Sequence, residues 1–214
     1  NCDLHIDTYK PADMPMAYGA NNHGSIVQIK DQWYIFYHRH TNGSWYSRQG
    51  CAEPISIAED GSIEQVEITS CGLNGGPLAG QGEYPAYLAC HLFTDEPSMY
   101  VGGDAFPKVM QDGKDGDEEI GYVGNVQNSA TIGFKYFDMK NVKKIRVTMR
   151  GYISGNIEVR LTWDGDVLAS LPIEFTNVWE TYESEIEIPD GIHSLYFTFR
   201  GDGNGALKSF ELLV

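Results

Sequence analysis

The stretch that decides the fold runs from Tyr18 to His40 and reads YGANNHGSIVQIKDQWYIFYHRH. It contains two short runs rich in β-branched and aromatic residues, and the polar turn Lys30-Asp31-Gln32 separates them. This pattern predicts a β-hairpin. In the second run, from Trp33 to His38, aromatic and apolar side chains occupy both alternating faces. We therefore expect an inner strand of a stacked β architecture, covered on both faces.

The composition of the 214 residues also favours an all-β chain. It includes 24 glycines and 12% aromatic residues, and no long amphipathic helical periodicity runs through it. Such a composition is typical of many short strands joined by turns. The length suits one large or two ordinary domains and is sufficient to bury a substantial core.

The charge of the chain excludes some classes of partner. Its formal net charge is -15, and nucleic-acid binding needs clustered Lys and Arg that are absent here. A neutral ligand such as a glycan is compatible with this charge. The acidic run Asp112–Glu119 lacks the spacing of a twelve-residue calcium loop, so it predicts a solvated loop. No stretch reaches the roughly 20 apolar residues that a membrane span requires.

Four cysteines, Cys2, Cys51, Cys71 and Cys90, are too far apart in the sequence for a common metal site and too few for a disulfide scaffold. Free buried thiols are the favoured interpretation, and a Cys51–Cys71 bridge is the alternative. Cysteine usage leaves open whether the protein is secreted or lies in a bacterial cytoplasm. The sequence begins with Asn1-Cys2-Asp3-Leu4, which contains no start methionine and does not read as a signal peptide. We therefore expect a fragment or a processed form.

A composition shift at Thr94-Asp95-Glu96-Pro97 predicts two domains, residues 1–93 and 94–214. In the first domain, Cys51–Ala58 and Ile63–Ser70 predict a second hairpin. In the second domain, four segments alternate cleanly between apolar and polar residues: 144–150, 157–163, 182–188 and 195–200. This alternation predicts a β-sandwich, with Trp163 in phase with the core residues.

Three blocks of the first domain, Gly19–Ser25, Gln32–His40 and Tyr46–Ile55, together resemble the end of the catalytic domain of family 43 glycoside hydrolases. The resemblance covers residues 1–93. It implies the terminal blades of a five-bladed β-propeller, in an enzyme that cleaves arabinofuranosides and xylosides with inversion.

Inverting hydrolysis needs a carboxylic acid and a carboxylate base. In the family that the chain resembles, an Asp base, a Glu acid and a further Asp come from earlier blades. Only 22 residues precede His23 here, and Asp3, Asp7 and Asp13 match none of the family's motifs. We therefore expect no catalytic residue within the chain, with the acid and base upstream. The remaining acidic candidates, Glu53 and Glu83, lie in a strand and in a glycine-rich loop and are expected to be structural.

The same resemblance implies two functional residues in the first domain. His23 matches a histidine on the propeller axis that holds a calcium ion or its coordinated water. Arg48 matches an arginine that reaches the sugar. Neutral imidazole can orient water, and a guanidinium offers a planar set of donors to hydroxyls. Without the resemblance, a hydrogen-bonded structural role would be favoured for His23.

The second domain resembles family 6 carbohydrate-binding modules, which are jelly-roll sandwiches. The matching blocks are Ile120–Val123, Asn156–Leu161, Trp179–Tyr182, Gly191–Phe197 and Ser209–Leu212. Sugar binding in such modules relies on aromatic rings that stack on sugar faces, together with a few amide hydrogen bonds.

The resemblance implies Tyr122 and Trp179 as the aromatic pair that sandwiches a sugar. Ala206 stands where the module usually offers an asparagine, and Asn204 is nearby. Lys208 stands where an acidic residue normally helps to hold a structural calcium ion, which argues against that second calcium site. The expected substrate-binding residues are therefore Arg48, Tyr122, Trp179 and Asn204.

Together these patterns predict an all-β chain, a partial β-propeller followed by a jelly-roll β-sandwich. The predicted function is that of the C-terminal portion of a plant-polysaccharide glycoside hydrolase, inactive on its own. The expected partners are arabinoxylan, xylan or arabinan, and a missing N-terminal propeller segment. Two alternatives stay open: a non-catalytic carbohydrate-binding protein and a purely structural accessory fragment.

Overall fold

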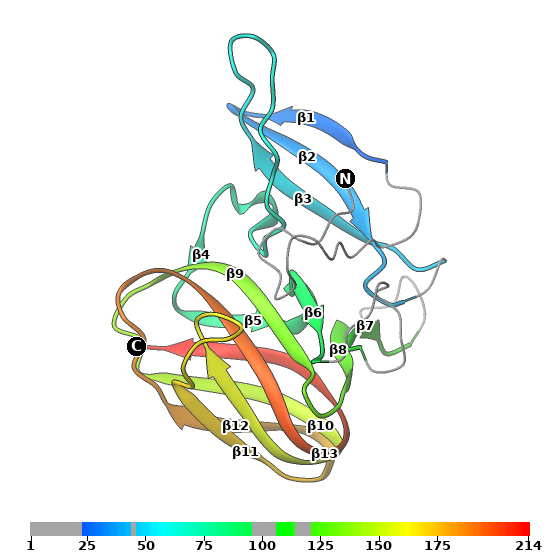
Figure 1. Ribbon diagram of the computed structural model, residues 1–214, viewed down its shortest axis with the longest axis vertical. Coiled ribbons are helices and arrows are strands. Elements are labelled where there is room, and N and C mark those ends of the chain that lie inside the picture. The colour runs from blue at the N-terminus through cyan, green and yellow to red at the C-terminus, as the bar shows by residue number, and fades with distance from the viewer. Residues whose placement is uncertain (1–22, 44–45, 96–105, 114–120) are drawn as a thin grey trace.

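The computed structural model describes residues 23–43, 46–95, 106–113 and 121–214. The described chain is all-β and consists of a small antiparallel sheet and a larger sandwich that is antiparallel except for one short parallel pairing (Figure 1). Two single-turn 3-10 helices, Gly72–Asn74 (η1) and Ala86–Leu88 (η2), lie between strands. The predicted fold class is confirmed.

The small sheet contains β1 (Ser25–Ile29), β2 (Gln32–Arg39) and β3 (Gln49–Ile55) in the order β1-β2-β3. The predicted hairpin is present, and Lys30 takes the left-handed backbone conformation at its turn, with a φ of 56°. β2 is the central strand, as expected. Coverage on both faces is not seen among the described residues, since β2 is half-buried over most of its length and β1 is exposed.

The second predicted hairpin forms only at its tip. The bridge Ile57–Ile63 closes a turn at Ala58–Gly61, but residues 64–70 are not a strand. Their polar groups bind elsewhere instead: Glu67 accepts a hydrogen bond from Lys135 Nζ at 2.8 Å, and the Ser70 amide donates to the Lys135 carbonyl. Contacts with the sandwich therefore replace the predicted ladder.

The sandwich contains ten strands of the described chain. Their bounds are β4 (Leu78–Ala79), β5 (Gly82–Pro85), β6 (His91–Phe93), β7 (Lys108–Gln111), β8 (Gly121–Val126), β9 (Thr131–Met139), β10 (Lys144–Arg160), β11 (Ala169–Ile173), β12 (Thr176–Glu185) and β13 (Gly191–Leu213). The main path is β11-β10-β13-β8-β7, with β12 beside β10 and with β4, β5, β6 and β9 attached. The strand predicted to reach Trp163 ends at Arg160, and Trp163 is 38% exposed in the following turn, so its assignment to the core was wrong.

β10 and β13 form a long ribbon that contributes to both layers of the sandwich. The first half of β10 pairs with β12, and its second half pairs with β11. Phe197 and Phe210 both lie on β13, yet their ring centroids are 5.0 Å apart. A flat strand would hold residues thirteen positions apart at a distance of about 40 Å. The ribbon therefore bends over itself and encloses the core.

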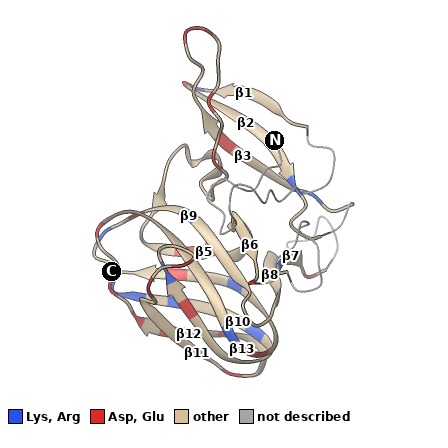
Figure 2. Cartoon of the chain, in the orientation of Figure 1, with Lys and Arg blue, Asp and Glu red and all other residues tan. Residues whose placement is uncertain are grey.

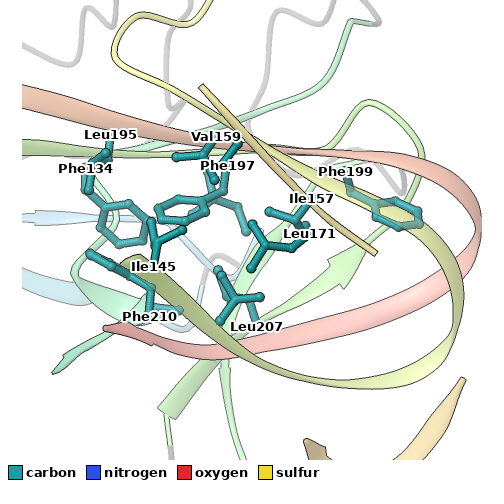
Figure 3. Close-up of a cluster of buried hydrophobic side chains, with 14 of the residues drawn as sticks. Phe134, Ile145, Ile157, Val159, Leu171, Leu195, Phe197, Phe199, Leu207 and Phe210 are labelled. Carbon is teal, nitrogen blue, oxygen red and sulfur yellow. The ribbon is translucent and has the colours of Figure 1, made fainter. Parts of the chain in front are cut away.

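The core between the layers is apolar and aromatic (Figure 3). Phe134 of β9 packs against Phe210 with a centroid separation of 4.7 Å, and Ile145, Leu195 and Leu207 are fully buried around them. Ile145 and Leu195 occupy the apolar phase of the alternating segments at 144–150 and 195–200. Burial alternates as predicted at 144–150, whereas Tyr196 and Thr198, in the polar phase of 195–200, are also buried.

The sheet boundary falls earlier than the composition shift at Thr94. β4 and β6 pair with β9, and β5 pairs with β13, so residues 78–93 lie within the large sheet. Tyr84 of β5 also packs on the core, 5.0 Å from Phe137 between ring centroids. By hydrogen bonding, the sandwich begins at Leu78. Strand pairing does not by itself define domains, so the predicted division into residues 1–93 and 94–214 stays a prediction.

Buried polar contacts join the small sheet to the sandwich. Arg39 is 4% exposed, and its guanidinium donates to the carbonyl oxygens of Ala89 at 3.1 Å and Cys90 at 2.7 Å. On the other side, the Val109 amide donates to the Thr41 carbonyl at 2.9 Å. Both carbonyls beside Arg39 belong to residues between η2 and β6. The two parts are therefore held together by donors and acceptors that are shielded from water.

The cysteine expectation is resolved for three of the four residues. Cys51, Cys71 and Cys90 are free thiols, so the Cys51–Cys71 bridge is not formed. Cys2 lies outside the described residues. In the same described part of the chain, no helix is long and apolar enough to cross a membrane.

Charged residues lie on several strands of the sandwich (Figure 2). Arg146 of β10 lies between two carboxylates, with N–O distances of 2.6 Å to Glu183 and 3.0 Å to Glu211. Lys144 binds Glu183 from the neighbouring position at 3.0 Å. These cross-strand pairs occupy the polar phase of the alternating segments, as the sequence predicts.

Candidate functional site

A hollow of about 760 Å³ opens on the sandwich. We call it the module hollow. Strands β7, β8, β10 and β13 and the start of β12 line it, and Tyr122, Arg150 and Asn204 are among its residues. Two of the residues predicted to bind sugar, Tyr122 and Asn204, are thus brought to one place although they are far apart in the sequence.

Trp179, the partner predicted for Tyr122, contacts it directly. Their ring centroids are 5.6 Å apart and the rings are inclined at 62°. The guanidinium carbon of Arg150 lies 4.2 Å from the Trp179 ring centroid and 5.2 Å from that of Tyr122. A sugar held between two rings needs them roughly parallel and separated by the thickness of the sugar. In this structure the two rings are inclined and in contact, and the Arg150 guanidinium lies against both of them.

The small side chain at Ala206 explains why these groups meet. Arg150 pairs in register with Ala206 across the β10–β13 ladder. Met110 pairs with Tyr122 across β7–β8. With only a methyl group on β13, side chains from β10 and β8 approach one another over it. The substitution of alanine for the expected asparagine therefore has a packing consequence.

Asp112 fixes the arginine in this position. Both of its carboxylate oxygens accept hydrogen bonds from Arg150 Nη2, at 2.9 and 2.8 Å. Burial raises the pKa of Tyr122, and the nearby Asp112 carboxylate raises this pKa further. Asp112 belongs to the run predicted to be a solvated acidic loop, so its role in an ion pair was missed. Residues 114–119 of that run lie outside the described chain.

Asn204 lies at the other end of the hollow. It pairs in register with Tyr152 across β10–β13, and its amide Nδ2 donates to Asn125 Oδ1 at 3.0 Å. The residue is exposed. Its side-chain carbonyl has no hydrogen-bond partner within the described part of the chain, so that oxygen is available to a ligand.

The backbone forms part of the floor of the hollow. Gly151 and Gly205 face each other across the ladder, and a Cβ added at Gly151 would lie 2.5 Å from the Gly205 Cα. Gly124 of β8 adds a third residue without a side chain. Close approach of this kind requires glycine, and it leaves a shallow surface on which a flat ligand can lie.

The predicted residues of the small sheet lie elsewhere. Arg48 lines a second hollow of about 620 Å³ together with Tyr46 and Tyr87. We call it the junction hollow, because β7 and β8 of the sandwich also line it. Arg48 Nη1 donates to His38 Nε2 at 3.1 Å, and the His38 ring lies 5.3 Å from that of His23. The structure thus groups Arg48 with His23 through His38, and separates both from Tyr122.

The donors around His23 do not by themselves fit a calcium ion, which prefers six to eight oxygen ligands. The described neighbours are the imidazole of His38 and the Arg48 guanidinium next to it. Within the described residues, no three His, Cys, Asp or Glu side chains gather as a metal site. Calcium at His23 therefore stays a prediction, and it would need oxygen ligands from residues not described here.

The carboxylates of Glu53 and Glu83 accept hydrogen bonds from groups that belong to the fold. Glu53 is 2% exposed and accepts hydrogen bonds from Tyr37 Oη at 3.1 Å and from the Thr69 amide at 2.8 Å. Burial raises the pKa of this carboxyl, although the hydrogen bonds from Thr69 oppose the change. Glu83 accepts from Ser209 Oγ at 2.6 Å. Their partners are structural groups of neighbouring strands.

Sequence reasoning missed four residues around the module hollow: Asp112, Arg150, Tyr152 and Phe175. A signal existed for Tyr152, which occupies the polar phase of the strand at 144–160, where a large aromatic side chain is unusual. No local signal marks Arg150, because its partners lie on other strands.

Comparison with known proteins identifies the relatives of this chain. Residues 109–212 match the sequence profile of the carbohydrate-binding modules of family 6. A xylosidase/arabinosidase of Thermoclostridium stercorarium is 60% identical over 218 aligned residues, which cover 99% of this chain and 46% of that protein. An arabinoxylan arabinofuranohydrolase of Paenibacillus polymyxa is 26% identical over 90% of this chain and 31% of its own length.

Solved structures agree on the fold. The crystal structure of a glycoside hydrolase family 43 arabinoxylan arabinofuranohydrolase from Bacillus subtilis, in complex with cellotetraose, superposes with a TM-score of 0.57. It is 21% identical, and the match covers 91% of this chain and 41% of that one. The chain resembles part of a family 43 glycoside hydrolase joined to a family 6-like carbohydrate-binding module.

A second structure matches the module alone. The family 6 module from Clostridium cellulolyticum, in complex with xylose, has a TM-score of 0.50 at 17% identity over 64% of this chain and 99% of its own. We refer to residues 109–212 as the module. The chain spans less than half of the length of the curated relatives it matches.

Proposed function

We propose that this chain is part of a glycoside hydrolase that removes arabinofuranosyl or xylosyl groups from plant polysaccharides with inversion. The observation that carries the proposal is the 60% identity to a xylosidase/arabinosidase over 99% of the chain. Sequence identity at this level, maintained across both the small sheet and the sandwich, supports a shared activity of the whole protein.

In this proposal the catalytic acid and base come from residues outside the chain, and the chain alone is inactive. The carboxylates of Glu53, which is buried, and Glu83, which is exposed, already bind structural groups. Arg48 contributes by donating to the sugar from the rim of the junction hollow, with His38 holding its guanidinium.

The small sheet is proposed to be a terminal part of a five-bladed propeller. Its edge strand β1 exposes Ile26, Val27 and Ile29. An exposed apolar edge strand tends to pair or aggregate unless another segment covers it. The N-terminal propeller segment is the proposed cover, because propeller blades bury their faces against one another.

A calcium ion is also proposed near His23, on the axis of the proposed propeller, and the His23 imidazole would help to hold the ion or its coordinated water. The test is a calcium titration of the longest form of the protein, followed by its melting temperature. A rise in melting temperature that is absent in His23→Ala supports the site, and an equal rise in both forms contradicts it.

The module is proposed to hold the polysaccharide, with arabinoxylan, xylan or arabinan as the ligand. The module hollow supports this function, because it combines aromatic side chains, amide groups and a floor of glycine. It also favours a second candidate function, that of a non-catalytic carbohydrate-binding protein, because all of its lining residues except Lys108 lie within the module.

The experiment that tests the proposal measures release of nitrophenol from nitrophenyl arabinofuranoside and xyloside. This chain, with its mass verified in the same tube, is expected to give no turnover, and a form that includes the preceding propeller segment is expected to give product of inverted configuration. Turnover by the verified chain would contradict the location of the acid and base. Glycan binding without turnover by the longest form would favour the non-catalytic candidate.

A further inference from the structure

The module carries an exposed aromatic pair that its resemblance to known modules does not assign. Tyr152 is 77% exposed and Phe175 is 56% exposed, and their ring centroids are 4.7 Å apart with an inclination of 34°. Tyr152 also lines the module hollow. Large aromatic side chains paired on a surface, next to a concavity, mark binding sites more often than chance exposure. We call these two residues the Tyr152–Phe175 pair.

Both members of the pair are held in place by the fold. Tyr152 lies within the β10–β13 ribbon, opposite Asn204. Phe175 lies in the short connection between β11 and β12. Tyr182 Oη donates to the carbonyl of Glu174 at 2.9 Å, just before Phe175, and Thr176 Oγ1 donates to the Val178 carbonyl at 3.0 Å, just after it. A ligand that stacks on these rings meets a surface that is already ordered.

Two residues with neutral hydrogen-bonding amides, Asn177 and Asn204, line the same hollow as Tyr152. Asn177 is exposed, and within the described chain nothing hydrogen-bonds its side chain. Asn204 keeps its side-chain oxygen available, as described above. Of the two cationic residues that line the hollow, Lys108 and Arg150, the second is neutralised by Asp112. An apolar ring surface bordered by neutral amides fits a sugar ring, which has an apolar face of C–H groups and a periphery of hydroxyls.

The expected aromatic pair is closed to a sugar in this structure. Arg150 lies over Trp179 and Tyr122, and those two rings contact each other at an incline. The surface that stays open to stacking in the same hollow is that of Tyr152, extended by Phe175. Gly151 and Gly205 line the same hollow as Tyr152 and Tyr122, and neither adds a side chain to its surface.

We propose that the Tyr152–Phe175 pair is the main sugar-stacking surface of the module, and that it takes one ring of a neutral polysaccharide that continues over the glycine floor. Asn204 and Asn177 hydrogen-bond the hydroxyls of that ring. The inference rests on the proposed function, because it names the residues with which the module holds its glycan. It differs from the arrangement implied by the resemblance, in which Tyr122 and Trp179 hold the sugar between them.

The test is isothermal titration calorimetry of the chain with xylohexaose, arabinoxylan oligosaccharides and arabinohexaose. Tyr152→Ala and Phe175→Ala are each expected to weaken binding of the preferred glycan by about tenfold, the loss of about 1.4 kcal/mol. Tyr152→Phe keeps the ring and is expected to bind within about twofold of the unchanged chain. The matched control is Ile192→Ala, an exposed apolar residue of β13 outside the hollow.

Tyr152, Phe175 and Ile192 are exposed, so their variants are expected to fold. A melting curve recorded on each sample verifies folding. Unchanged affinity in Tyr152→Ala and Phe175→Ala, with loss in Tyr122→Ala or Trp179→Ala, would overturn the inference and leave the proposed function intact. If the unchanged chain binds none of the glycans, the proposed binding function of the module fails as well, and the inference fails with it.

Discussion

At the scale of single residues, the chain places several charged groups where the fold needs them. Glu53 lies at the contact between the small sheet and residues 64–70, and its two carboxylate oxygens accept from Tyr37 Oη, the Thr69 amide and Thr69 Oγ1. Thr69 Oγ1 in turn accepts from the Cys71 amide at 3.1 Å. One carboxylate therefore ties Thr69, in a segment without a backbone ladder, to the small sheet.

Replacement of Glu53 by alanine is expected to destabilise the protein by about 3 kcal/mol, because buried donors would be left without acceptors. Glu53→Gln retains one acceptor oxygen and is expected to cost about 1 kcal/mol. Urea denaturation at neutral pH measures both values. A loss below about 1 kcal/mol in the alanine variant would contradict the role assigned to these hydrogen bonds.

The pH dependence of stability offers a second measurement on the same residue. Burial raises the pKa of Glu53 above the ordinary value of 4.5 that the unfolded chain shows. The folded state therefore keeps the proton at a higher pH than the unfolded state, and this contribution is lost as pH rises through the folded pKa. Relative to Glu53→Gln, the unchanged chain is expected to lose stability as pH rises from 4.5. A difference between the two that is constant with pH would show that the pKa is not raised.

At the scale of elements, the β10–β13 ribbon depends on glycines that let its two strands bend together. Gly203 has a φ of 93°, and a Cβ there would lie 1.9 Å from the Tyr152 carbonyl oxygen. The backbone at Gly203 and the Tyr152 carbonyl could relieve this clash only by moving apart, which would break the backbone hydrogen bonds between β10 and β13. The bend that allows Phe197 to meet Phe210 is therefore encoded partly by the absence of side chains.

Gly203→Ala is accordingly expected to destabilise the chain by about 3 kcal/mol, from the clash and from the unfavourable backbone conformation. The control is Gly50→Ala in β3, where an added Cβ meets nothing within 4 Å. The control is expected to change stability by less than about 0.5 kcal/mol. Equal unfolding midpoints for the two variants would argue against a tight ladder at Gly203.

Sequence patterns predicted the individual strands better than they predicted which strands and side chains would contact one another. The alternation at 144–150 predicted which side chains are buried, since the period of two is a local property. Arg150 could not be assigned to the Tyr122–Trp179 pair, because that contact depends on side chains from β8, β10 and β12 and on the small residue at Ala206. The edge of the sandwich was missed for the same reason, since β4 pairs in parallel with β9, almost sixty residues later.

At the scale of the whole molecule, the small sheet and the sandwich are expected to unfold as one unit. Arg39 satisfies two buried carbonyls between η2 and β6, and its guanidinium is shielded from water. A connection of this kind transmits stability between two parts, because loss of one leaves the other with unsatisfied polar groups.

The unchanged chain is expected to show a single calorimetric transition, and Arg39→Met is expected to separate it into two, with the small sheet melting at the lower temperature. The control is Arg200→Met, which removes an exposed ion pair with Asp95 at 2.9 Å and is expected to cost less than about 1 kcal/mol without splitting the transition. A single transition in Arg39→Met, shifted no more than in the control, would mean that the two parts are coupled by other contacts.

The strands β4, β5 and β6 have a consequence for how such proteins can be recombined. They precede the composition shift at Thr94, yet they cover the edge of β9 and extend β13. If a fusion protein were made by cutting the gene at residue 94, the sandwich would be transferred without β4, β5 and β6. The part left behind would keep these three strands without their pairing partners β9 and β13. To keep all strand pairs of the sandwich together, the cut has to fall between β3 and β4. The unit that can be exchanged between proteins is therefore longer than the region that matches the family 6 modules, which begins at residue 109.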